Sequence, residues 1–112
     1  MERVQLGEFE ELVLLICAIM NGESYGVSVM DEIKEQTDRK VNISAVHTAL
    51  DRLEKKGFLN SSIGGATQER GGRSKRYFHV TNLGIQAIEI NRQVRNELYD
   101  KIPTAVLKPS KL

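Results

Sequence analysis

The chain of 112 residues contains no tryptophan, one cysteine and two prolines, and its longest apolar run, Leu12 to Met20, is nine residues long. Such a run is too short to cross a bilayer and indicates a buried helix. Cys17 lies inside this run without a second thiol, which excludes an internal disulfide and favours a core role. The acidic N-terminal region lacks the basic flank of a secretory signal, so we expect a cytoplasmic protein.

Signals for catalysis are also scarce. His47 and His79 are isolated from each other, and no nucleophile elbow or metal-ligand spacing is present. The glycine pairs at 64–65 and 71–72 lack the Gly-Lys-Ser/Thr ending of a phosphate-binding loop. We therefore expect no enzyme activity, no cofactor and no metal site.

The formal net charge is only +1, but charge is distributed unevenly along the chain. Residues 1–38 carry two basic and nine acidic side chains, a balance of −7, whereas residues 39–76 carry nine basic and three acidic ones, a balance of +6. A basic central block favours a polyanionic partner, because contacts to phosphates release counterions. By charge alone, a solvated surface explains the block equally well.

Apolar periodicity and capping residues predict the elements. The segment before Asn21-Gly22 has the stripe of a core helix, and Ser24 can cap a second, amphipathic helix. The alternating residues 39–44 are compatible with a short strand. Ser44 is the predicted N-cap of a third helix that ends before Gly57. Two strand-like runs, 58–63 and 74–81, then flank a polar loop rich in glycine.

Thr81 is predicted to cap a last helix, at about 81–100, with a near-heptad apolar seam. We expect one domain over residues 1–102, including this helix as a dimerisation helix, and a flexible tail over 103–112. The predicted dimer contacts are the seam residues Leu83, Ala87, Ile90, Val94 and Leu98. They also fit the core of a single protomer, but a seam at a chain end favours a partner helix.

The order of elements predicts a winged helix-turn-helix fold, of the α+β class but mostly α. In that architecture the third helix enters the major groove of DNA and the β-hairpin, or wing, braces it. The predicted contacts on the third helix are Ser44, Ala45, His47, Thr48, Arg52 and Lys55. Those in the wing are Arg70, Arg73, Lys75 and Arg76. Within the second strand, Phe78 and Val80 are expected in the core and Arg76 at its rim.

The run from Tyr25 to Gly84 resembles the PadR-like family of winged-helix transcriptional regulators. The resemblance rests on "SYG" at the second helix, "SAVHTALDRLEKKGFL" in the third helix, and "GGRSKRYFHVTNLG" in the wing and exit. It implies a repressor that binds a near-palindromic operator as a homodimer through its first and last helices. It also places Tyr25 near the phosphate backbone. The chain is similar to the short branch of the family, which lacks a large C-terminal domain.

Two features set this chain apart from that resemblance. His47 and Thr48 stand where many relatives have Tyr-Pro, so we expect a different operator sequence. Without tryptophan, a site for flat aromatic effectors at the dimer interface has no support, and any small-molecule effector is unknown. The alternative hypothesis is a winged helix that binds an acidic protein partner instead of double-stranded DNA.

Overall fold

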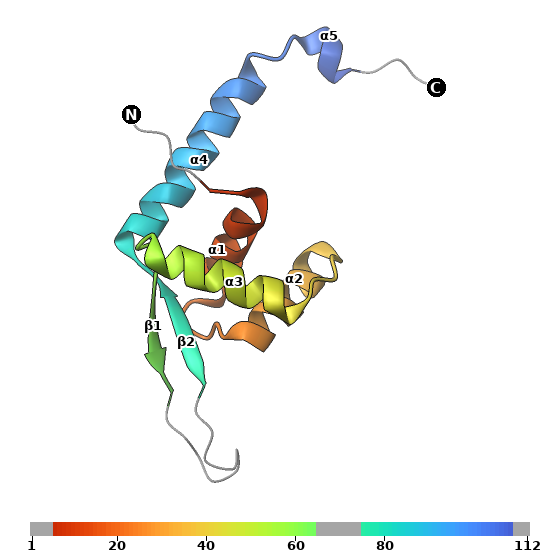
Figure 1. Cartoon of the computed structure of the whole chain (residues 1–112). Helices are drawn as coiled ribbons and strands as arrows, with labels where there is room; N and C mark the ends of the chain where they lie inside the picture. Colours follow the sequence, from red (N-terminus) through yellow and green to blue (C-terminus); the bar gives the residue numbers. More distant parts are fainter. Residues whose placement is uncertain (1–5, 65–74, 109–112) are drawn as a thin grey trace.

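The computed structural model describes residues 6–64 and 75–108. Within these ranges its elements follow the predicted order except that no strand lies between the second and third helices and a short helix follows the last predicted one. Figure 1 shows the helices of the first half of the chain forming the body, a hairpin projecting from one side and a long helix leaving on the other. The elements are α1 (Glu8–Met20), α2 (Gly26–Thr37), α3 (Ile43–Lys55), β1 (Leu59–Ile63), β2 (Arg76–Val80), α4 (Asn82–Asp100) and α5 (Thr104–Leu107). The predicted winged helix-turn-helix fold is confirmed.

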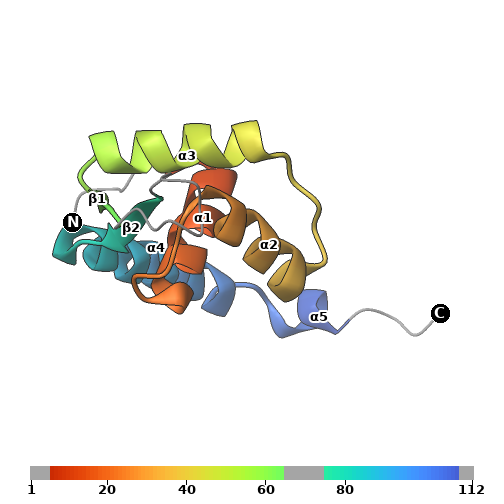
Figure 2. The ribbon, with the colours of Figure 1, turned by 90° about the horizontal axis from the view of Figure 1, so that it is seen from below.

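The core lies where α1, α2 and α3 meet above the base of the hairpin. In Figure 2, α3 spans one side of the body as an outer layer over α1 and α2. Buried side chains from these three helices, from both strands and from the first turns of α4 form one cluster. Burying their apolar surface is the main favourable contribution to folding. The cluster comprises Val13, Leu14, Ile16, Cys17, Val29, Ile33, Val46, Ala49, Leu50, Leu53, Leu59, Phe78 and Ala87.

The first connection ends α1 as predicted but starts α2 differently. Asn21 and Gly22 adopt left-handed backbone conformations, with φ of 51° and 95°. The N-cap of α2 is Tyr25, whose backbone N–H donates to the Ser28 hydroxyl at 2.9 Å. The prediction that Ser24 caps this helix is therefore wrong. Ser24 is buried, and its carbonyl accepts from the N–H of Phe78 at 2.8 Å, which attaches this connection to β2.

The second connection contains no strand, so the strand predicted over residues 39–44 is wrong. Val41 and Ile43 pack against the core, which brings Ile43 into the first turn of α3. The N-cap is consequently Asn42, whose side-chain oxygen accepts from the N–H of Ala45 at 2.7 Å. Ser44 is the second residue of the helix, and its predicted capping role is also wrong.

The hairpin is an antiparallel pair in which Leu59 faces Val80 and Ile63 faces Arg76. Gly57, with φ of 83°, lets the chain turn from α3 into β1. Thr81 caps α4 as predicted, because its hydroxyl accepts from the N–H of Gly84 at 3.0 Å. A Cβ on Gly84 would lie 2.3 Å from the Phe58 carbonyl oxygen, so α4 starts in direct contact with the hairpin.

Beyond its first turns, α4 leaves the body. Gly84 and Ala87 are buried, whereas every residue from Arg92 to Asp100 is exposed. The short helix α5 lies within the segment expected to be a flexible tail, whose last four residues are outside the described ranges. None of the helices in residues 6–64 and 75–108 combines the length and the hydropathy that crossing a membrane requires.

Candidate nucleic-acid interface

The outward face of α3 carries the polar residues that the sequence predicts as DNA contacts. Periodicity turns Val46, Leu50 and Leu53 into the core and leaves the opposite side of the helix free. Ala45 is half-buried, and the other predicted contacts on this helix are exposed: Ser44, His47, Thr48, Arg52 and Lys55. A convex helix with short side chains near its N-terminus fits the major groove.

His47 is held at the point where α3 approaches α2 most closely. A Cβ on Gly26 would lie 2.4 Å from Cε1 of the imidazole ring, so only glycine leaves room for the ring here. The first turn of α2 therefore supports the side chain at the centre of the α3 face. The sequence marks Gly26 only through the "SYG" motif, and no periodic pattern indicates this contact.

Tyr25, Lys75 and Tyr77 form a cluster beside this helix, where α2 begins and the wing emerges. The Lys75 ammonium lies 3.9 Å from the centroid of the Tyr25 ring, and Tyr77 packs edge-on against the same ring at 5.6 Å and 80°. Attraction between a cation and an aromatic face holds the lysine in place. Tyr25 and Lys75, together with His47, border a hollow of about 190 Å³. Tyr25 and Lys75 thus lie beside the α3 face.

The other predicted cations are arranged in two ways. Arg76 turns toward α3, where its guanidinium bonds to Glu54 and its Nε donates to the Ser61 hydroxyl at 3.0 Å. Arg52 lies 3.8 Å from the Glu10 carboxylate, while Lys55 is exposed without an ion-pair partner among the described residues. Arg70 and Arg73 fall in the segment 65–74, outside the described residues. Sequence reasoning missed Glu54 and Ser61, which carry no pattern linking them to Arg76.

The predicted dimer residues fall into two groups. Leu83, Val94 and Leu98 are exposed, with Leu98 at 60%, and Ile90 is half-buried. Ala87 is 1% exposed and belongs to the core of its own protomer. Its small side chain lets α4 pack closely on the body, so within the predicted seam this residue has no surface left for a partner.

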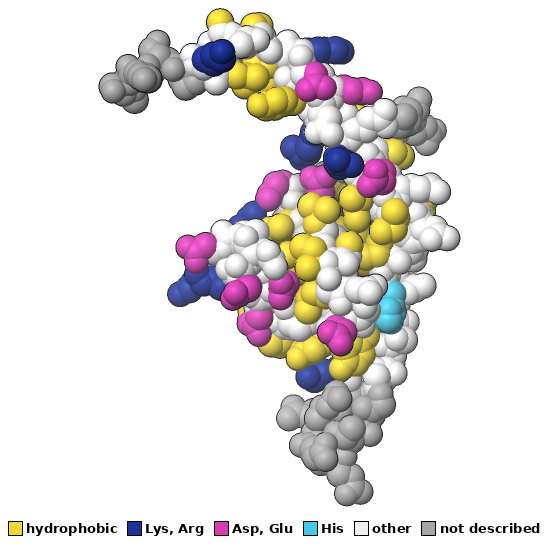
Figure 3. Space-filling model, turned by 180° about the vertical axis from the view of Figure 1, so that it is seen from behind, with side chains coloured by type: hydrophobic (Ala, Val, Ile, Leu, Met, Phe, Trp, Pro, Cys, Tyr) yellow, Lys and Arg dark blue, Asp and Glu magenta, His cyan; other side chains and the backbone are white. Residues whose placement is uncertain are grey.

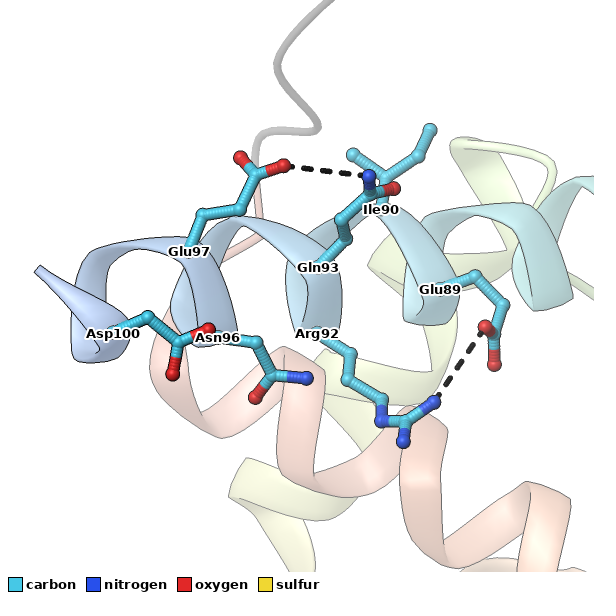
Figure 4. Close-up of a pocket in the computed structure, with 7 residues that line it drawn as sticks. All are labelled: Glu89, Ile90, Arg92, Gln93, Asn96, Glu97 and Asp100. Atoms are coloured by element: carbon cyan, nitrogen blue, oxygen red, sulfur yellow. Dashed lines mark hydrogen bonds and ion pairs between the residues drawn. The ribbon is translucent and has the colours of Figure 1, made fainter.

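Two further hollows among the described residues lack the features of a catalytic site. The one in Figure 4 runs along α4 alone, where Glu89 pairs with Arg92 and Gln93 donates to Glu97 within the same helix. A second, beside Cys17 and His79, has a volume of about 290 Å³. Burial raises the pKa of the Cys17 thiol to about 11, against a smaller lowering by Ser24, so the thiol is a poor nucleophile at neutral pH. The described residues contain no cluster able to hold a metal ion.

Comparison with known proteins identifies the family. The model of the "Transcriptional regulator PadR-like family" matches residues 15–90. A PadR family transcription regulator from Clostridium difficile superimposes with a TM-score of 0.70 at 23% identity, covering 84% of this chain and 93% of that one.

A PadR-like transcriptional regulator from Bacillus cereus gives a TM-score of 0.70 at 18% identity, covering 91% and 93% of the two chains. A PadR family regulator from Eggerthella lenta gives 0.70 at 18%, covering 92% and 88%. Comparison with curated proteins finds no match. The family model spans well over half of the chain, and the chain therefore belongs to the PadR-like family of transcriptional regulators.

Proposed function

We propose that this protein is a sequence-specific regulator of transcription, without catalytic activity, that binds double-stranded DNA in the cytoplasm as a homodimer and acts as a repressor at a near-palindromic operator. The observation that carries the proposal is the exposed α3 face with the Tyr25–Lys75 cluster directly beside it. In a winged-helix protein, one helix enters the major groove and the wing contacts DNA beside it. Here α3 corresponds to that helix, and Lys75 is a cation at the base of the wing.

The exposed residues of this surface fall into two groups, those suited to base edges and those suited to phosphates. Ser44, His47 and Thr48 occupy the N-terminal half of α3, where hydroxyls and an imidazole meet base edges, and half-buried Ala45 allows close approach to a thymine methyl. Arg52, Lys55, Tyr25 and Lys75 surround them and suit phosphates. Arg70 and Arg73 of the wing complete the contacts, in keeping with the preference of arginine for a narrow minor groove.

Homodimerisation is supported by the apolar side chains on the part of α4 that stands away from the body. Val94 and Leu98 are exposed there, and Leu15 and Ile19 are exposed on α1. Figure 3 shows hydrophobic side chains gathered on the face opposite α3, with acidic side chains around them. A two-fold pair of such chains presents two α3 helices to DNA, which matches a near-palindromic operator.

Selection of duplexes from a random pool, followed by titration at several salt concentrations, tests the proposal. We expect the affinity to fall with salt at a slope of about 0.9 per phosphate neutralised. Lys55→Gln removes one phosphate contact from each protomer of the proposed dimer, so it should reduce the slope by about twice that amount and weaken all duplexes alike. Thr48→Ala should instead change their ranking. Failure to select any duplex, or affinity independent of salt, would refute DNA binding and favour an acidic protein partner.

A further inference from the structure

Arg76 is joined to α3 by a closed set of hydrogen bonds at the base of the wing. Its Nε donates to the Ser61 hydroxyl at 3.0 Å, and that hydroxyl donates to Oε2 of Glu54 at 2.6 Å. Nη2 of Arg76 bonds to Oε1 of the same carboxylate. One residue each from α3, β1 and β2 thus forms a three-membered ring of hydrogen bonds, which we name the wing lock.

The remaining contacts of Arg76 are also made within the protein, and its side chain is 48% exposed. Nη1 lies 3.8 Å from the carboxylate of Asp51, and the guanidinium carbon lies 5.3 Å from the ring centroid of the buried Phe78. The Glu54 side chain is 28% exposed, so its pairing with Arg76 is less screened than an open surface pair. The planar guanidinium therefore has donors committed on both of its edges, to Ser61 and to the carboxylates of α3.

We propose that Arg76 is a positioning residue of the DNA-binding surface and not a phosphate contact. Together with Glu54 and Ser61 it fixes the direction of the wing relative to α3, so that both elements reach their grooves without a further ordering step. Preorganisation of this kind increases affinity by reducing the entropy lost on binding. The inference rests on the proposed DNA-binding function and assigns the role of one basic residue within it.

The wing lock makes an unusual prediction about an acidic residue. A carboxylate on the DNA-facing helix repels phosphates, so its neutralisation alone should strengthen binding. Glu54→Gln should instead weaken binding, because Ser61 and Arg76 bond to different oxygens of the carboxylate. The amide keeps an acceptor at only one of these two positions and loses the negative charge that pairs with Arg76. Asp51 is 58% exposed, and within residues 6–64 and 75–108 its one ion pair is the 3.8 Å contact with Arg76. Its negative charge should therefore only repel phosphates, so Asp51→Asn should not weaken binding.

The test compares Glu54→Gln, Arg76→Gln and the double variant on a duplex selected by the unmodified protein. Glu35→Gln, an exposed carboxylate near the far end of α2, is the charge-matched control. We expect about a fivefold loss for Glu54→Gln and at least that for Arg76→Gln, with the double variant no weaker than Arg76→Gln alone. Tighter binding by Glu54→Gln, or losses that multiply in the double variant, would overturn the proposal.

NMR of the arginine Nε–H groups supplies a readout that does not depend on DNA affinity. In the free protein the Arg76 group should be rigid by heteronuclear NOE, and it should become mobile in Glu54→Gln. Addition of the duplex should leave its chemical shift nearly unchanged. A mobile Arg76 in the free protein, or a large shift on binding, contradicts the lock. If the unmodified protein selects no duplex, the proposed function fails and the NOE result alone decides on the lock.

Discussion

The contact between Gly26 and His47 links a backbone position in α2 to the side chain that we propose reads bases. The Cβ of Gly26→Ala would meet the imidazole at 2.4 Å, and the ring, being exposed, can yield by turning outward. We expect a shift in the ranking of selected duplexes with a stability change within about 1 kcal/mol, since alanine favours the helix. Duplex selection and thermal unfolding measure the two effects.

Val27→Ala is the matched control for this substitution. Val27 is the next residue of the same helix turn and is 48% exposed, so its truncation should leave the duplex ranking unchanged. An unaltered ranking for Gly26→Ala would show that His47 does not read bases from its observed position.

At the same scale, sequence reasoning predicts which residues face outward but not what they touch. The 3.6-residue period places His47 and Thr48 outside and Val46 and Leu50 inside, as observed. The direction of Arg76 depends on Glu54, which is 22 residues away in the chain and reaches it only after the hairpin has folded. From the sequence alone, Arg76 is therefore predicted as a phosphate contact, because its partner Glu54 is visible only in the tertiary structure.

The start of α3 is set by one cap, and two adjacent candidates allow a direct test. Asn42→Ala removes the acceptor of the Ala45 N–H and should lower the free energy of unfolding by about 1 kcal/mol. Ser44→Ala removes a hydroxyl from an exposed position inside the first turn and should change stability by less than about 0.5 kcal/mol. Chemical denaturation of the two variants measures the difference, and equal losses would place the cap at neither residue alone.

At the scale of elements, the helices are predictable because each combines an apolar stripe with a stop signal. The α1 and α3 stripes end at Asn21-Gly22 and at Gly57, where positive φ values are observed. The strand predicted over 39–44 does not form. An alternating pattern favours an extended backbone, but a strand also needs a neighbouring strand to pair with, and the pattern cannot show whether one is present. The free edge of β2 instead pairs with Ser24, through a single bridge to Phe78. No strand pattern in the sequence around Ser24 predicts this bridge.

Across the whole molecule, much of the uneven charge is satisfied internally. The acidic residues in the first turn of α1 interact favourably with the helix dipole. They also form ion pairs with three other parts of the chain: the link before α3, the C-terminal end of α3, and α4. Glu8 pairs with Arg39 at 2.8 Å, Glu10 with Lys56 at 2.5 Å, and Glu11 with Arg95 at 3.0 Å. The net charge of +6 over residues 39–76 therefore overstates the number of cations free to contact DNA, because several of them pair with carboxylates of the protein itself.

The last prediction concerns the second half of α4 and its role in the proposed dimer. A glutamate at position 98 would place a charge in the apolar stripe, so Leu98→Glu should convert the proposed dimer to a monomer at micromolar concentration, as measured by light scattering. Asn96→Asp adds the same charge to the side of α4 opposite the seam, where Asn96 is labelled in Figure 4, and should leave the dimer intact. Because α3 is remote from this change, the monomer should retain weak binding to a half-site while losing preference for the full palindrome. A dimer unaffected by Leu98→Glu would show that two copies meet elsewhere, and the exposed α1 residues Leu15 and Ile19 would then be the next surface to substitute.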